Sequence, residues 1–145
     1  MDLEDPLKLF KIWMAEAEKS EINDPNALSL ATVDKNHQPH VRMVLLKGLD
    51  EKGFVFYTNL NSPKSNDIKY NPKAEMCFHW KSLQRQIRIF GSIIQVSERE
   101  ADAYFNTRPY ESKIGAWASD QSKVMILKNI QKQKCVFIGR VYRDK

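Results

Sequence analysis

The sequence is poor in the residues that build metal sites and disulfide frameworks. Its 145 residues include two cysteines, Cys77 and Cys135, which stand far apart without CxxC or Cys/His ligand spacing. We therefore expect free thiols, with neither a zinc site nor a disulfide framework. The histidines, His37, His40 and His79, have no metal-ligand spacing either. Turn or strand-surface roles are the simpler interpretation of these three side chains.

Long apolar runs and common catalytic strings are also missing. No stretch approaches the roughly 20 apolar residues that span a bilayer, and the first residues are acidic where a signal peptide would be basic. We expect a cytoplasmic protein that makes no membrane contact. GxSxG, HExxH, Walker A and GxGxxG strings do not occur. If the chain is an enzyme, a cofactor rather than a catalytic side chain is expected to carry the chemistry.

The charge is positive but not concentrated. Net charge is +5, and no block of five Lys or Arg residues occurs. A phosphate-bearing partner and a soluble surface that happens to be basic both explain this balance, whereas nucleic acid is a weaker option. With 42% hydrophobic and 28% charged residues, the chain fits one compact domain over residues 1–145.

Capping residues and prolines mark the predicted helices. Asp5-Pro6 opens an amphipathic helix to about residue 20, within an N-terminal segment 1–22. Ser62-Pro63 opens a short helix to about Tyr70, and a capping box at Ser97 opens another to about residue 107. Weaker helical patterns cover 111–118 and 122–132, so that helices are expected over about 97–132. Residues 133–145 form a tail without a recognisable motif.

Closely spaced β-rich runs predict the sheet. They cover residues 27–33, 40–47, 54–58, 74–80 and 85–96. Gly91 is expected to be a bulge or a site of close backbone approach. Strands linked by hairpins over about 27–96, with few helices between them, predict a mainly β, α+β fold: an antiparallel barrel with peripheral helices.

Several strings together resemble one family. Arg-Met-Val-Leu-Leu-Lys stands at residues 42–47, Phe-Tyr-Thr-Asn-Leu-Asn-Ser-Pro-Lys at 56–64 and Arg-Gln at 85–86. Tyr-Phe-Asn-Thr-Arg-Pro follows at 104–109, Ser-Lys-Ile-Gly-Ala-Trp at 112–117 and Ser-Asp-Gln-Ser at 119–122. In this unbroken order over about residues 5–123, they resemble the pyridoxine/pyridoxamine 5'-phosphate oxidase family.

The resemblance implies a Greek-key split barrel of six strands and a homodimer with flavin mononucleotide (FMN) at its interface. It implies FMN-dependent oxidation of pyridoxamine or pyridoxine 5'-phosphate to pyridoxal 5'-phosphate, with O2 as electron acceptor. The flavin contacts it implies are Arg42, Met43, Val44, Leu45, Leu46, Lys47, Tyr57, Thr58, Lys64, Gln86, Gln121 and Ser122. The implied clamp on the vitamin phosphate consists of Lys47, Tyr104, Arg108 and Ser112.

Two departures from the family pattern bear on activity. Pro63 stands where the family usually has arginine, which removes one phosphate contact and is expected to weaken FMN binding. The family also continues through Trp-Gly-Gly and Arg-x-His-x-Arg segments that residues 133–145 do not match, so we expect slower turnover than in a full-length relative. The alternatives are a non-catalytic protein that binds FMN or pyridoxal phosphate and a basic barrel that binds single-stranded nucleic acid.

Overall fold

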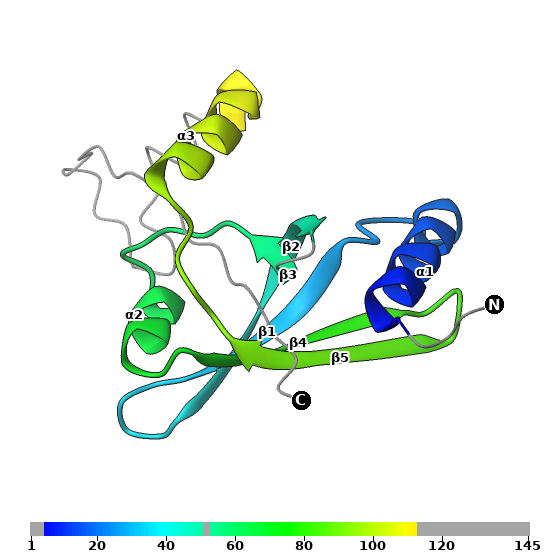
Figure 1. Cartoon of the computed structure of the whole chain (residues 1–145). Helices are drawn as coiled ribbons and strands as arrows, with labels where there is room; N and C mark the ends of the chain where they lie inside the picture. The colour runs from blue at the N-terminus through cyan, green and yellow to red at the C-terminus, as the bar shows by residue number, and fades with distance from the viewer. Residues whose placement is uncertain (1–4, 51–52, 113–145) are drawn as a thin grey trace.

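One antiparallel sheet with helices around it makes up the part of the chain that the computed structural model describes, residues 5–50 and 53–112 (Figure 1). In chain order its elements are α1 (Pro6–Ser20), β1 (Ala27–Val33), β2 (Pro39–Asp50), β3 (Gly53–Phe56), α2 (Pro63–Tyr70), β4 (Lys73–Trp80), β5 (Arg85–Ser92) and α3 (Glu98–Thr107).

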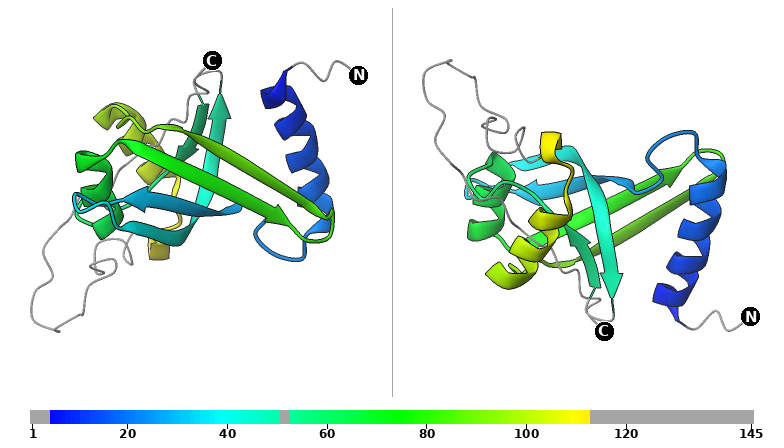
Figure 2. Two further views of the ribbon diagram at one scale, coloured as in Figure 1. Left: turned by 90° about the horizontal axis from the view of Figure 1, so that it is seen from below. Right: turned by 90° about the horizontal axis from the view of Figure 1, so that it is seen from above.

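The strands are arranged as a Greek key. Their order in the sheet is β3-β2-β1-β4-β5, so β4 follows β3 in the chain but pairs with β1 on the far side of β2. This is the order of a Greek key, in which the fourth strand returns beside the first. The sheet curls strongly, as the views from below and above show (Figure 2). The predicted antiparallel barrel fold is thereby confirmed.

Helix α1 begins where the sequence predicts. The Asp5 carboxylate accepts a hydrogen bond of 2.9 Å from the backbone N–H of Leu7, and Pro6 occupies the first turn. The helix anchors itself through Phe10, which is 4% exposed. The Phe10 ring packs edge-on against Phe54 and Phe78, with centroids 4.9 and 5.1 Å away. One aromatic side chain therefore joins the helix to β3, at one edge of the sheet, and to β4, next to the strand at the other edge.

The core lies on the concave side of the sheet. Alternate residues of β4, among them Met76, Phe78 and Trp80, are almost fully buried, as are Leu28 and Leu30 of β1. This is the period of two expected of strands with one covered face. Their neighbours in sequence point to the convex face, which we call the outer face.

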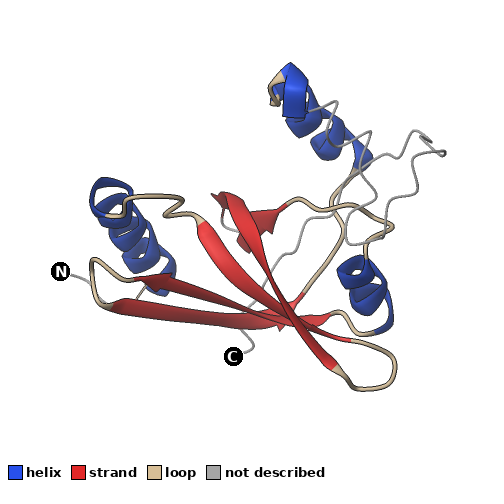
Figure 3. Ribbon diagram, turned by 180° about the vertical axis from the view of Figure 1, so that it is seen from behind, coloured by secondary structure: helices blue, strands red, loops and turns tan. Residues whose placement is uncertain are grey.

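Helices α1 and α2 lie at opposite ends of the curled sheet, and α3 lies toward the same end as α2 (Figures 1 and 3). Ser97 caps α3 at the predicted position, where its Oγ accepts a hydrogen bond of 3.3 Å from the backbone N–H of Glu100. Within the described residues, no helix combines the length and the apolar character needed to cross a bilayer.

Three details differ from expectation. Strand β3 ends at Phe56, two residues early, and β5 ends at Ser92 rather than near 96. The ladder runs without interruption through Gly91, and the irregularity falls instead between Leu46 and Gly48. The described residues hold five strands. Most of the helical patterns predicted for 111–132, and the tail 133–145, lie outside the described residues.

Candidate functional site

Two cations from different elements meet near the N-terminal end of α2. Arg42 points inward from β2 and its side chain is 22% exposed, while Lys64 in the first turn of α2 is 4% exposed. Burial, together with a smaller effect of the positive charge of Arg42, lowers the pKa of Lys64 to about 8. Paired, partly desolvated cations of this kind attract an anion strongly.

The start of α2 adds the positive end of a helix to this cation pair. Ser62 caps the helix without a side-chain bond to its N–H groups. Its hydroxyl instead lies 2.9 Å from that of Ser65, which donates to the carbonyl of Asn59 at 2.5 Å. Pro63 fills the first turn and is exposed. The positive end of the helix therefore lies beside Lys64, an arrangement suited to phosphate.

A buried polar network holds the guanidinium of Arg42. Its Nη1 donates to Thr32 Oγ1 at 2.6 Å and to the carbonyl oxygen of Leu30 at 3.2 Å. Its Nη2 lies 3.5 Å from Oδ2 of Asp67, which is 5% exposed. The same oxygen accepts from Thr32 Oγ1 at 2.7 Å and lies 3.0 Å from Nδ1 of His40. Burial lowers the pKa of Arg42, and the Asp67 carboxylate opposes that effect.

The sequence did not identify Thr32 and Asp67 as site residues, and His40 was expected to lie in a turn or on a strand surface. A signal for two of them was available. Thr32 continues the inward alternation of Leu28 and Leu30 with a polar side chain, and a buried hydroxyl needs a partner. Asp67 follows Lys64 by three residues, which places both on the same side of α2.

An aromatic pair joins β3 to α3. The rings of Tyr57 and Tyr104 are stacked at 7°, with centroids 3.6 Å apart. Burial raises the pKa of Tyr57, and Tyr104 and Glu100 add to that rise. The structure thus brings together a predicted flavin contact and a predicted substrate contact. Thr58, also predicted to contact the flavin, is buried next to Tyr57.

The remaining predicted residues toward α3 lie close in sequence to Tyr104. Arg108 is the C-cap of α3, four residues beyond Tyr104, and its backbone N–H donates to the carbonyl of Phe105 at 3.2 Å. Arg108 and Ser112 are both half-buried. Gln121 and Ser122 lie outside the described residues.

Several predicted flavin residues point away from the cluster of Arg42 and Lys64. Met43 and Leu45 alternate with Val44 and Leu46 on β2, so the first pair lies on the outer face and the second pair on the core side. Gln86 of β5 is exposed on the outer face, where it is paired with His79 of β4. Within one copy of the chain, the predicted site residues therefore lie in two separate groups.

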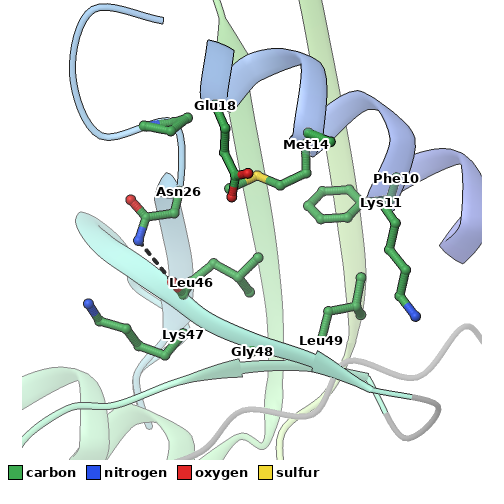
Figure 4. Close-up of a pocket in the computed structure, with 11 residues that line it drawn as sticks. Phe10, Lys11, Met14, Glu18, Asn26, Leu46, Lys47, Gly48 and Leu49 are labelled. Carbon is green, nitrogen blue, oxygen red and sulfur yellow. Dashed lines mark hydrogen bonds between the residues drawn. The ribbon is translucent and has the colours of Figure 1, made fainter. Parts of the chain in front are cut away.

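Lys47 belongs to a different surface from Arg42. It is the extra residue of the β2 bulge and is exposed. Together with Leu46 it lines a cleft of about 450 Å³ between α1 and β2 (Figure 4). Phe10 and Met14 of the helix face Leu46 and Leu49 of the strand across this cleft. The other lining residues are Lys11, Ala15, Glu18, Pro25, Asn26 and Gly48.

The described ranges contain no group of three or more His, Cys, Asp or Glu side chains that could hold a metal ion. The chemistry of the donors instead suits an anion. Arginine, lysine, hydroxyls and a helix N-terminus are the groups with which proteins hold phosphate.

The family model and the curated relatives that match this sequence carry the same family description. A family model described as pyridoxamine 5'-phosphate oxidase matches residues 14–135. The pyridoxine/pyridoxamine 5'-phosphate oxidase of Pelagibacter ubique (strain HTCC1062) is 62% identical over 125 residues, which are 86% of this chain and 60% of that protein. The enzyme of the same name from Rhodopseudomonas palustris (strain TIE-1) is 60% identical over 120 residues, 83% of this chain and 57% of that protein. The chain thus spans about three fifths of the length of these relatives.

Solved structures show the same fold at low sequence identity. PhzG from Burkholderia lata 383, crystallised with tetrahydrophenazine-1-carboxylic acid, has a TM-score of 0.86 at 22% identity, over 94% of this chain and 76% of that one. A pyridoxamine 5'-phosphate oxidase-related, FMN binding protein from Nostoc punctiforme PCC 73102 has a TM-score of 0.78 at 18% identity, over 94% and 81%. These similarities support the split-barrel architecture.

Proposed function

Because the chain belongs to the pyridoxamine 5'-phosphate oxidase family, we propose that it binds FMN and oxidises pyridoxamine or pyridoxine 5'-phosphate to pyridoxal 5'-phosphate, with O2 as electron acceptor. The observation that carries the proposal is the meeting of Arg42 and Lys64 beside the first turn of α2. Both were expected to hold flavin from motif position alone. Folding brings these two residues together, although they lie 22 positions apart in the sequence and belong to different elements.

The residues of this cluster fit the phosphate of FMN. A dianionic phosphate would stabilise the protonated form of Lys64, whose pKa is lowered by burial and by Arg42. Arg42 supplies a planar fork for phosphate oxygens, and the start of α2 supplies the positive end of a helix dipole. When bound, FMN would supply the acceptor for the hydride that leaves the substrate and would be reoxidised by O2.

The phosphate of the vitamin substrate would be held by a second set of residues. Tyr104, Arg108 and Ser112 lie in and just after α3, and Lys47 is the fourth member that the family motifs suggest. The stack of Tyr104 on Tyr57 supports this assignment, because it fixes the α3 side of the clamp next to a proposed flavin contact. These side chains would bind and orient the substrate.

A homodimer would reunite the two groups of site residues. The outer face carries exposed apolar side chains at Val41, Met43 and Phe90, 67%, 63% and 63% exposed, in the same sheet face as Gln86. An exposed apolar patch of this kind is typical of an interaction surface. We propose that a second copy covers it and that Gln86 and Lys47 then serve the site of the partner.

The decisive experiment compares FMN with riboflavin, which lacks the phosphate, by quenching of flavin fluorescence. We expect FMN to bind more tightly, and Arg42→Ala to weaken FMN by about 1.5–3 kcal/mol, the value of a hydrogen bond to a charged group. Arg99→Ala, an exposed arginine of α3 to which no role in the site is assigned, is the matched control. Peroxide release with pyridoxamine phosphate on the same preparation measures turnover. Equal affinities for FMN and riboflavin would refute the phosphate site.

A further inference from the structure

A buried carboxylate stands next to the cluster proposed to bind an anion. Asp67 is 5% exposed and its Oδ2 lies 3.5 Å from Nη2 of Arg42. Charge alone makes this placement unfavourable for phosphate binding, because a negative group repels the ligand. Its presence therefore calls for a different explanation.

The hydrogen bonds around Asp67 form a directed chain. The guanidinium of Arg42 donates to Thr32 Oγ1 at 2.6 Å, and that hydroxyl donates in turn to Oδ2 of Asp67 at 2.7 Å. A threonine hydroxyl has one hydrogen to give and lone pairs to accept with, so both bonds form at once. His40 Nδ1 lies 3.0 Å from the same oxygen. The carboxylate thus ties together β1, β2 and α2.

These hydrogen bonds leave part of the Arg42 guanidinium available to bind a ligand. Arginine has five N–H donors in a rigid fork. Within the part of the chain that the structure describes, Arg42 has two hydrogen bonds from Nη1 and one ion pair at Nη2. The other N–H groups, including that of Nε, remain for an incoming oxygen.

We infer that Asp67, acting through Thr32, is a positioning residue that fixes the Arg42 guanidinium in the orientation that receives a phosphate. The inference rests on the proposed function, because it concerns the same anion site. Arginine is a flexible side chain, and ordering it on binding reduces affinity unless it is held in place beforehand. Asp67 therefore strengthens binding by preorganisation although its charge opposes the ligand.

The two effects of Asp67 have opposite signs, which makes the inference testable. If the carboxylate only balances charge, Asp67→Ala makes the cluster more positive and tightens FMN binding. If it positions Arg42, Asp67→Ala weakens FMN binding by about three- to tenfold, the scale of ordering one flexible side chain. Riboflavin affinity should stay within about twofold in either case. Unchanged or tighter FMN binding overturns the inference.

Further variants separate positioning from a general loss of structure. In an Arg42→Ala background, Asp67→Ala should no longer weaken FMN binding, because the side chain it orients is gone. A weakening of the same size in both backgrounds would overturn the inference. If Asp67→Ala does not fold, Thr32→Val removes the linking hydroxyl at nearly constant shape and should weaken FMN binding similarly, whereas Thr32→Ser should restore it. Unchanged binding by a folded Thr32→Val also overturns it.

The result can be distinguished from a failure of the proposed function. If the unsubstituted chain binds FMN and riboflavin equally, the phosphate site itself is wrong. If it prefers FMN and Arg42→Ala removes the preference while the Asp67 and Thr32 variants keep it, the site is correct and only the positioning role fails.

Discussion

The ring of Tyr104 lies flat on the ring of Tyr57, with the centroids 3.6 Å apart and the planes at 7°. Tyr57 directly follows β3, and Tyr104 is in the middle of α3. Ala101 is the buried residue of that helix, with 4% exposure. The aromatic stack is therefore a principal contact between α3 and the barrel.

A double-mutant cycle should detect this contact. We expect Tyr57→Leu and Tyr104→Leu each to lower the free energy of unfolding, with a coupling energy of about 0.5–1.5 kcal/mol between them, the usual value for an aromatic pair. Chemical denaturation of the four proteins measures the coupling. Additive effects would show that the rings do not interact in solution.

FMN binding should weaken as pH rises through the pKa of Lys64. That pKa is lowered from 10.5 to about 8 in the folded chain, and a phosphate ligand favours the protonated ammonium. Affinity should therefore be highest below pH 8 and fall about tenfold between pH 7 and pH 9, which corresponds to one linked proton. The phosphate is a dianion throughout this range. Fluorescence titrations at several pH values provide the test.

Lys64→Arg is the control for this pH dependence, because a guanidinium stays charged up to pH 9. Its FMN affinity should vary little between pH 7 and pH 9, whereas the exposed neighbour Lys69→Met should keep the full dependence. The same pKa shift predicts stability. The unfolded chain holds the Lys64 proton more tightly, so the free energy of unfolding should rise between about pH 8 and pH 10.5. An FMN affinity of the unsubstituted chain that does not change with pH would contradict the assignment.

Phe10 should be the residue of α1 on which stability depends most. Truncation to alanine removes a side chain that is 4% exposed and leaves a cavity between the rings of Phe54 and Phe78. We expect a loss of about 3–5 kcal/mol in the free energy of unfolding. Ile12→Ala, on the same helix but 45% exposed, should stay within about 0.5 kcal/mol. Similar losses in the two variants would contradict the packing described.

A charge on the outer face should separate the proposed dimer. Met43→Asp would place an unpaired carboxylate in the apolar surface that a second copy covers, and burying such a group is strongly unfavourable. We expect the dissociation constant of the dimer, measured by sedimentation, to rise at least about tenfold. Ile12→Asp is the control on an exposed surface away from that face. A monomeric native chain, or a dimer that Met43→Asp leaves intact, would refute the interface.

Local signals in the sequence predict most of the fold. The start of α1 at Pro6 and the N-cap at Ser97 follow from capping chemistry, which acts over a few residues. The ends of β3 and β5 were less accurate because Tyr57 and Ile94 have strand propensity, whereas strand ends depend on the backbone partners that the rest of the chain supplies.

The candidate site was predictable only in part. Family motifs identify Arg42 and Lys64, and the structure brings them together. The bond between Thr32 and Asp67 joins residues 35 positions apart, and no local pattern encodes which side chains will meet across that distance. The division of the site between two surfaces also depends on the curl of the sheet, which alternation of residue types does not specify.

The bulge at Lys47 frees one position of β2 from the alternation between core side and outer face. Before it, Val44 and Leu46 point to the core, and after it Leu49 does, so the alternation slips by one residue while the strand continues. Lys47 absorbs the slip and belongs to neither phase of the pleat. A deletion of this residue would leave Leu46 and Leu49 in step on a regular ladder. Position 47 is therefore exempt from the inside-or-outside constraint of its neighbours, and its side chain is open to evolution for binding alone.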